Sequence, residues 1–574
     1  MKQKDDGSSN FLLAAILSAL ILFTWNYFFD NGFTNKSDTN ITNSNNISEK
    51  DTMDISHNNH FESVATDNQN EYDRNDKRYK IELENDSIRG SISLVGARIN
   101  DIILKKYKDS VESEDNVRLL SPAKMNNAYF AEFGWISNKT ETPNSETIWK
   151  ADSKTLSPNN DVTFSWVNNE GVLFQIIFSI DDRYMFNIEQ KVVNNTDKKI
   201  NVSAYNLINK TWHVDSNNND TISHQGAAAV INQGLEEYSY SKLKDNRIKK
   251  FKQNIVDWIG ITDKYWLVSI IPSKSEQVTS SFQYAEKQQL DKIQVDSIYP
   301  ANSLNPRSEY NVSNRLFVGP KQTDILDDYA QKYNIKLFDR AIDFGWLYII
   351  TKPLFYILKF CYNILGNFGL SIMFVTVIIK ILMFGLSNKS YKSIAKLRSL
   401  QPKIDQLKSF YGNDKIQFNQ KLLELYKKEK VNPFSGILSL FIQIPVFFAV
   451  YKVLYVTIEM RHAPFYGWIQ DLSSPDPTNI FNLFGLLPIN LPSFLHIGAW
   501  PILMSLSMYL QQKMSPQPSD PTQAQIMRLL PIILLFMFAN FPAGLLIYWT
   551  WSNLLSILQQ KFLSFNATEK HLKA

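Results

Sequence analysis

The chain has 574 residues, with 60 Lys and Arg, 56 Asp and Glu, and one cysteine, Cys361. This length exceeds that of one ordinary domain, and the formal net charge of +4 is too small to indicate nucleic-acid binding. A lone cysteine excludes an intrachain disulfide and argues against a cysteine-based metal cluster. Because the sequence also lacks a phosphate-binding loop, H-E-x-x-H and G-x-S-x-G, we expect no metal or other cofactor.

The first apolar run covers residues 11–29, follows Lys2 and Lys4, and ends in aromatic residues. No small-x-small cleavage site follows it, so we predict an uncleaved transmembrane anchor with residues 1–10 in the cytoplasm. A cleaved signal peptide is the alternative. Residues 30–79 are rich in Asn, Ser and Asp, which predicts a disordered periplasmic linker.

Short alternating runs of apolar residues predict an all-β domain over residues 80–335. Alternation along Val172–Ile180 resumes at Tyr184 after Asp181-Asp182, which is typical of a hairpin with one buried face. Further runs of this kind are Lys80–Leu83, Ser91–Leu94, Val162–Trp166, Trp258–Ile261 and Tyr265–Ile271. One β-sandwich fits this length, and the direction of the anchor predicts that it lies in the periplasm.

Residues 336–365 are predicted to form an amphipathic helix that lies in the membrane interface. Aromatic residues such as Trp346 and Phe360 recur against Lys352 and Lys359, and Pro353 should kink the helix. An ordinary surface helix of the β-domain is the alternative.

The apolar run Phe368–Leu386 is long enough to cross a bilayer as one helix. Its single formal charge is Lys380, and Thr376 lies four residues earlier, on the same helical face. A lysine this deep in a bilayer costs roughly 2.5–3.5 kcal/mol, which makes Lys380 a candidate functional residue. The alternative is that its long side chain reaches the lipid headgroups.

Residues 388–432 are strongly basic and show helical spacing interrupted at Tyr411–Asp414. This pattern predicts a helical hairpin, which the positive-inside rule places in the cytoplasm. A solvated charged surface is the simpler interpretation of the same charges. The hairpin residues singled out as candidates for binding are Lys396, Arg398, Lys403, Lys427 and Lys428.

Four further transmembrane spans are predicted, at residues 434–458, 494–512, 526–538 and 543–562. The loop between the first two is poor in basic residues, as expected outside the membrane, and the tail 564–574 is basic. With the anchor, this gives six spans and two cytoplasmic termini.

Polar side chains recur at helical spacing inside these spans, including Ser439 with Gln443 and Trp549 with Ser552, Ser556 and Gln559. One such stripe usually reflects interhelical hydrogen bonding. Several stripes around one lysine, in later spans that contain no Asp or Glu, predict a water-containing cavity that opens toward the basic hairpin.

Several motifs closely resemble those of the bacterial YidC/Oxa/Alb family of membrane-protein insertases. They are Asp343–Trp346, Leu400–Ile404, Leu425–Pro433, Ile442–Phe447, Arg461–Phe465, Gln512–Pro516, Phe541–Leu545 and Tyr548–Asn553. The resemblance is dense between residues 338 and 560. Upstream, it implies only that the β-domain looks like the family's supersandwich, a relative of sugar mutarotases.

The resemblance implies a five-helix core, residues 366–563, around a hydrophilic groove that is open to cytoplasm and lipid and closed to the periplasm. Lys380 stands where the family has an arginine, so the charge is kept but bidentate binding of a carboxylate is lost. Thr376 matches a groove threonine and Trp549 an aromatic groove position, and Gln443 and Ser552 complete the predicted groove. The residues matching a slide for an exiting helix are Phe447, Met504 and Met537.

We therefore expect a multi-domain membrane protein of the bacterial inner membrane that inserts and helps fold nascent membrane proteins, alone or with the Sec translocon. It should not be an enzyme. Expected partners are nascent membrane proteins, the lipid bilayer, the Sec translocon and the ribosome, with no small-molecule substrate. A secondary transporter is one alternative, although a repeated half and intramembrane acids are missing. A mutarotase-like periplasmic sugar-binding protein is the other, although catalysis of that kind would need a histidine such as His224 paired with a carboxylate.

Overall fold

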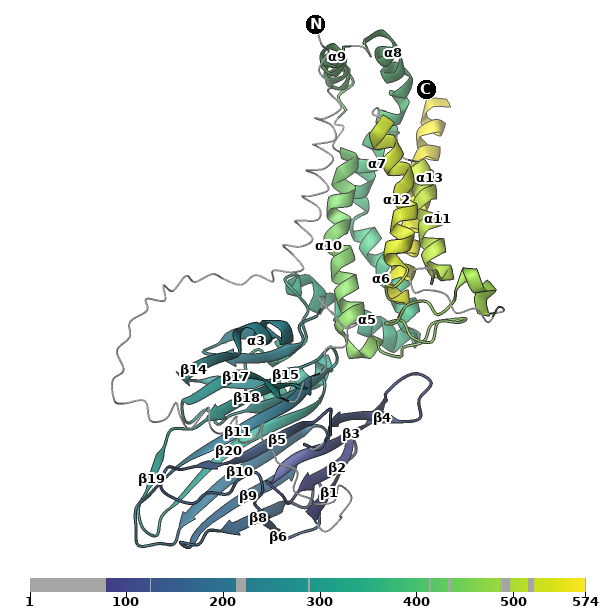
Figure 1. Ribbon diagram of the computed structural model, residues 1–574. Coiled ribbons are helices and arrows are strands. Elements are labelled where there is room, and N and C mark those ends of the chain that lie inside the picture. The colour runs from purple at the N-terminus through teal and green to yellow at the C-terminus, as the bar shows by residue number, and fades with distance from the viewer. Residues whose placement is uncertain are drawn as a thin grey trace. The chain divides into compact units, whose positions relative to one another are not determined.

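The computed structural model describes residues 79–123, 125–212, 223–287, 290–411, 414–431, 435–485, 487, 496–514 and 521–572. The predicted cytoplasmic N-terminus, the anchor, the linker up to residue 78 and the last two residues of the tail lie outside this range. The chain divides into two compact units, Met1–Trp346 and Leu347–Ala574 (Figure 1), and each is described by itself.

The first unit is built from two large β-sheets (Figure 1). Among the described residues, the first sheet has 11 strands in the order β14 (Ile248–Asn254), β17 (Val278–Lys287), β18 (Leu290–Ile298), β11 (Ile200–Trp212), β5 (Tyr129–Ile136), β3 (Arg98–Lys108), β2 (Ile88–Ser93), β1 (Lys80–Glu84) and β7 (Thr155–Leu156), with β19 (Asn302–Leu304) on β11 and β4 (Asn116–Leu120) on β3. The 9-stranded second sheet has the order β13 (Gly234–Ser239), β12 (Gly226–Ile231), β15 (Val256–Thr262), β16 (Trp266–Ile271), β20 (Glu309–Pro320), β10 (Met185–Asn194), β9 (Val172–Ile180), β8 (Val162–Val167) and β6 (Lys150–Ala151).

The predicted hairpin is confirmed by strands β9 and β10, which pair in antiparallel register from Val172↔Asn194 to Ile180↔Phe186. Every second residue of β9, beginning with Val172, is buried, and the residues between are half-buried. The alternation in the sequence therefore corresponds to one face of the sheet turned toward the core.

The core lies between the two sheets, which face one another as a sandwich. The ring of Trp135 on β5 lies 5.2 Å from that of Phe174 on β9. Gln190 on β10 donates from Nε2 to the carbonyl oxygens of Gly134 (2.8 Å) and Tyr205 (3.2 Å) in the first sheet. Contacts of both kinds between inner faces confirm the predicted mainly-β domain.

The helix predicted over residues 336–365 begins only at Tyr348, so its first part was predicted wrongly. Residues 336–346 belong to the first unit, where Phe338 packs its ring 5.5 Å from Phe317 and 6.0 Å from Trp258. Leu337 has a φ of 52°, which a continuous α-helix does not allow. Among the described residues of this unit, the helices are α3 (Tyr240–Asn246), α4 (Thr323–Lys332) and the 3₁₀ turn η2 (Phe338–Ala341).

The second unit is helical. Where the structure describes this unit, its elements are α5 (Tyr348–Leu365), α6 (Phe368–Leu382), α7 (Phe384–Ser399), α8 (Gln401–Tyr411), α9 (Lys415–Lys428), α10 (Ser435–Val456), η3 (Ile458–Met460), η4 (Ile480–Gly485), α11 (Ala499–Lys513), α12 (Pro521–Phe538) and α13 (Ala543–Leu572). The spans predicted at 434–458, 494–512, 526–538 and 543–562 fall on α10 to α13 with shifted ends. The predicted hairpin break at Tyr411–Asp414 separates α8 from α9.

The single straight helix predicted over Phe368–Leu386 is not observed, because α6 ends at Leu382 and α7 leaves at an angle of 67°. Gly385 and Ser387, both weaker helix formers than Ala, lie just after the break. Among the described residues, no individual helix combines the length and apolar character needed to cross a membrane. The bent pair formed by α6 and Phe384–Ser393 meets that requirement together.

Candidate functional site

The charged site of the second unit is built on α6. Asn367 starts this helix by accepting a hydrogen bond from the backbone N–H of Leu370 (3.1 Å). Thr376 and Lys380 then follow one turn apart, and both line the same cavity. Lys380 Nζ donates to Ser556 Oγ on α13 at 2.8 Å, so this lysine has a hydrogen-bond partner, which is a neutral hydroxyl.

A second hydrogen bond connects α13 to α10. Gln443 Nε2 donates to Ser552 Oγ at 3.3 Å. Ser552 and Ser556 lie one helical turn apart, so a single face of α13 holds side chains from both α6 and α10.

Lys380, Gln443 and Ser552 border a small cavity of about 20 Å³, which is enough for one water molecule. Its lining residues are Thr376, Ile379, Lys380, Met383, Ser387, Tyr391, Gln443, Val446, Tyr548 and Ser552. Ser387 and Tyr391 reach it because the chain bends after Leu382. Lys380 is the one formal charge among the lining residues, so the cavity attracts an anionic group.

Trp549, which was predicted in the groove, is not among the residues that line this cavity. Its ring instead lies 4.7 Å from Phe447 and 5.0 Å from Phe538. Met504 is fully buried in the same cluster, whereas Met537 is 47% exposed. The structure therefore joins Trp549 to two of the three predicted slide residues in one aromatic cluster.

The basic residues of α7 to α9 surround a small apolar core of Leu397, Leu400, Ile404 and Val431. Lys396, Lys403, Lys427 and Lys428 are exposed, and the side chain of Arg398 lies outside the described residues. Lys403 donates to Glu429 at 2.7 Å and holds the pKa of that carboxyl below its usual value. The exposed lysines form a positively charged surface.

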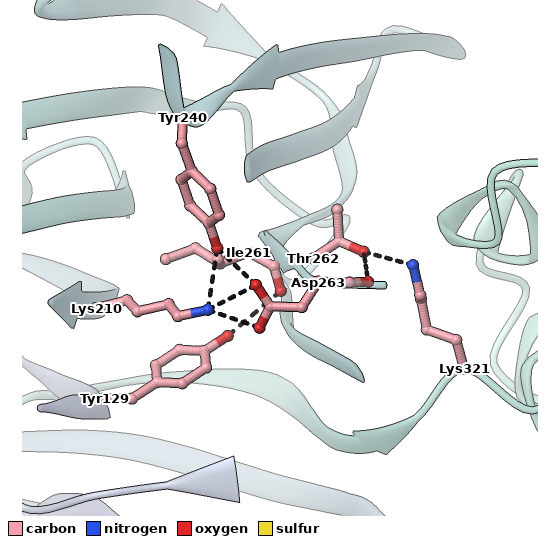
Figure 2. Close-up of polar contacts among 7 residues, drawn as sticks. All are labelled: Tyr129, Lys210, Tyr240, Ile261, Thr262, Asp263 and Lys321. Carbon is pink, nitrogen blue, oxygen red and sulfur yellow. Dashed lines mark hydrogen bonds and ion pairs between the residues drawn. The ribbon is translucent and has the colours of Figure 1, made fainter. Parts of the chain in front are cut away.

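A second polar cluster joins the two sheets of the first unit (Figure 2). Lys210 Nζ at the end of β11 lies 2.6 Å from both carboxylate oxygens of Asp263, which follows β15. Tyr240 donates to the same carboxylate at 2.8 Å, and Lys321 donates to Thr262 at 3.0 Å. The charges of Lys210 and Asp263 neutralise one another, so neither is left to bind a ligand. Since Lys210 comes from the first sheet and Asp263 from the second, the ion pair connects the two sheets.

This cluster makes the first unit sensitive to alkaline pH. Burial, and then the charge of Asp263, raise the pKa of Tyr129 and Tyr240 well above the usual 10.0. Above about pH 10 the unfolded chain loses these protons while the folded chain retains them, so stability that is complete below pH 10 is lost as pH rises. Above pH 10 we expect the free energy of unfolding to fall by about 1.4 kcal/mol per pH unit for each tyrosine.

Urea unfolding followed by pulse proteolysis between pH 9 and 11 measures this loss. Tyr129→Phe and Tyr240→Phe should each reduce the slope, because phenylalanine has no proton to lose. Equal stability at pH 9 and pH 11 would contradict the expectation.

The loop of residues 458–479 connects the first turns of three helices. Asp476, which is 2% exposed, accepts from the backbone N–H of Trp500 at the start of α11 (2.8 Å). The N–H groups of Ala543 and Gly544, at the start of α13, donate to carbonyls of this loop at 2.8 and 3.0 Å. Asn367 Nδ2 donates to the Pro464 carbonyl at 3.2 Å. The loop therefore fixes one end of α6, α11 and α13.

Sequence reasoning missed Ser556 as the partner of Lys380, and Ser387 and Tyr391 as cavity residues. Ser556 belonged to the polar stripe on α13, so its helical spacing from Ser552 was the available signal. For Ser387 and Tyr391 the sequence offered no signal, because their position at the cavity depends on the bend after Leu382. His224 Nε2 lies 3.1 Å from the Ala227 carbonyl. Among the described residues, no group of three or more His, Cys, Asp or Glu side chains could hold a metal ion.

Comparison with known proteins matches both parts of the chain. One family model, the YidC periplasmic domain, covers residues 80–357, and another, the 60Kd inner membrane protein, covers residues 360–570. The chain is 56% identical over 488 residues to the membrane protein insertase YidC of Rickettsia rickettsii (strain Iowa). The aligned region covers 84% of this chain and 87% of the relative. The chain is 52% identical over 559 residues to that of Rickettsia felis, covering 97% and 98%.

Among solved structures, the chain resembles an active YidC insertase with the first transmembrane domain resolved, with a TM-score of 0.35, 16% identity and coverage of 84% of this chain and 92% of that chain. It also resembles a galactose mutarotase related enzyme from Lactobacillus acidophilus, with a TM-score of 0.31, 13% identity and coverage of 42% and 97%. The assignment rests on the sequence relatives, which match this chain over most of their length. The chain therefore belongs to the YidC family of membrane protein insertases, inner-membrane proteins of bacteria that have a periplasmic domain and are not enzymes.

Proposed function

We propose that the Lys380 cavity is the place where the polar flank of an incoming helix is partly solvated during insertion. The observation that carries this proposal is the isolated charge of Lys380 among Thr376, Gln443 and Ser552. In this proposal the cavity widens into a groove that is open to the cytoplasm and to lipid.

Solvation gives the energetic reason. Each charge on a translocated flank costs several kcal/mol in hydrocarbon, and hydroxyl, amide and ammonium groups offset part of that cost. An acidic flank gains from Lys380 and also from the membrane potential, which contributes about 2.3 kcal/mol per charge per 100 mV when negative charge moves outward. Burial of the apolar segment in lipid supplies the net driving force, so no nucleotide is needed.

The aromatic cluster of Phe447, Phe538 and Trp549 is proposed as the surface along which the apolar segment leaves. Met537 is exposed beside it and is available for contact, whereas Met504 supports the cluster from within. Trp549 thus belongs to the exit surface in this proposal, and the groove itself is formed by Lys380 and its polar neighbours.

Topology and partners are part of the same proposal. Six spans with both termini in the cytoplasm place the exposed lysines of α8 and α9 on the cytoplasmic side. There their positive charge favours contact with the ribosome and its RNA. Cooperation with the Sec translocon, and a chaperone role in folding, belong to the proposed activity.

Lys380→Ala tests the proposal with two substrates that differ only in having Asp or Asn residues in the translocated flank. We expect about tenfold less insertion of the acidic substrate and less than twofold loss for the neutral one, because only the acidic flank loses an electrostatic partner. Insertion is measured by protease protection in proteoliposomes.

Lys380→Arg is the matched control and should keep the preference, because it keeps the charge. Equal losses for both substrates in Lys380→Ala would contradict an electrostatic role for this lysine.

A further inference from the structure

Ser556 has a defined hydrogen-bonding role in the second unit. Its Oγ donates to the Ser552 carbonyl one turn earlier on α13 (2.9 Å) and lies 2.8 Å from Lys380 Nζ. A hydroxyl has a single proton to donate. Because that proton goes to the Ser552 carbonyl, the second contact must be donated by the ammonium. Ser556 is fully buried, so this contact fixes the ammonium against α13.

Two buried amide atoms on α13 and α7 have no hydrogen-bond partner among the described residues. They are Nε2 of Gln559, three residues after Ser556 on α13, and Oδ1 of Asn388 on α7, next to the cavity residue Ser387. The helices α7 and α13 are in contact. A buried donor and a buried acceptor without partners are costly, and a polar ligand that reached them would remove that cost.

We propose that Ser556 is a positioning residue that holds Lys380 in a closed resting state, and that a carboxylate of the incoming flank takes its place on the ammonium. Exchange is favourable in this direction, because a carboxylate brings a full opposite charge to the ammonium, whereas the serine offers only a neutral oxygen. Gln559 and Asn388 then receive peptide groups of the same flank. This inference rests on the proposed function of the Lys380 cavity.

The test measures how often the closed state opens. A cysteine is introduced at Val446, which lines the cavity from α10, in a full-length chain that carries Cys361→Ser and is reconstituted in nanodiscs. The rate of its modification by a water-soluble maleimide is recorded. Ser556→Ala should raise this rate about fivefold, because the hydrogen bond that holds the Lys380 ammonium against α13 is removed. The rise should be absent in a Lys380→Ala chain, which already lacks the same bond.

Two comparisons separate this effect from a general loss of structure. Ser371 on α6 is a buried serine that donates to its own helix at 2.8 Å, to the Asn367 carbonyl, so Ser371→Ala is the matched control and should leave the rate unchanged. Ser556→Thr and Ser556→Val have nearly the same shape, and only the valine chain should show the faster rate. This second pair decides the question if Ser556→Ala does not fold.

Equal rates for the Ser556→Thr and Ser556→Val chains would overturn the proposal, as would a rise that persists in the absence of Lys380. The insertion assay with acidic and neutral flanks is separate. If Lys380→Ala reduces insertion of the acidic substrate more than that of the neutral one while Ser556→Val labels slowly, the role of Ser556 fails and the role of the cavity stands. If Lys380→Ala reduces insertion of both substrates equally, the cavity proposal fails whatever the labelling rates are.

Discussion

Glu132→Ala is expected to destabilise the first unit by about 3–5 kcal/mol, because it removes the carboxylate from a buried ion pair. Glu132 on β5 lies 2.6 Å from Arg98 Nε on β3 and accepts from the Tyr205 hydroxyl of β11 at 2.6 Å. The Arg98 and Glu132 side chains are 6% and 2% exposed. Without the carboxylate, a guanidinium charge stays in the protein interior beside a tyrosine hydroxyl that has lost its acceptor.

The loss is measured by urea unfolding of the first unit within the full chain, followed by pulse proteolysis. Glu84→Ala is the matched control: Glu84 lies 2.9 Å from Lys105 but is 71% exposed, so its loss should cost far less stability than the loss of Glu132. Similar costs for the two variants would show that burial does not strengthen the Glu132 contacts.

Asp476→Ala is expected to destabilise the second unit by about 2–4 kcal/mol, because one buried carboxylate organises a loop and caps a helix. It accepts from the N–H of Trp500, from the Thr478 hydroxyl at 2.7 Å and from Trp468 Nε1 at 3.1 Å. Gly498 approaches so closely that a Cβ there would lie 2.6 Å from the Asp476 carboxyl carbon. Removal of the side chain leaves a void as well as unsatisfied N–H groups.

Hydrogen exchange at the amide of Trp500 gives a direct measurement, because this amide loses its acceptor. Asp405→Ala serves as the control, since Asp405 is exposed on α8 and should have little effect. Unchanged protection of Trp500 in Asp476→Ala would contradict the capping role.

The parts of the fold that depend on local patterning could be predicted from the sequence. The β9–β10 hairpin is encoded by alternation over neighbouring residues, and the shared face of Thr376 and Lys380 follows from helical periodicity. Phe338 shows where this approach fails. Its amphipathic surroundings suit a helix, but burial beside Trp258 and Phe317 places it in another unit.

The candidate site could be predicted only in part, because its geometry depends on contacts between helices. The polar stripes identified Lys380, Gln443 and Ser552, but periodicity does not indicate which serine the lysine reaches. The bend after Leu382 brings Ser387 and Tyr391 to the cavity, and no proline marks it. Trp549 is large enough to join an aromatic cluster with Phe447. Packing between helices, which helical spacing does not reveal, determines that its ring lies in this cluster and not in the groove.

The 458–479 loop has a mechanical consequence for the helices that it joins. Because the loop holds α6, α11 and α13 at their first turns, the three helices can move apart at their other ends by tilting about the held ends. Ser556 lies roughly 20 Å along α13 from the pivot, at 1.5 Å per residue. A tilt of roughly 10° would then move it by about 3 Å, which is enough to admit a carboxylate while the first turns stay in place.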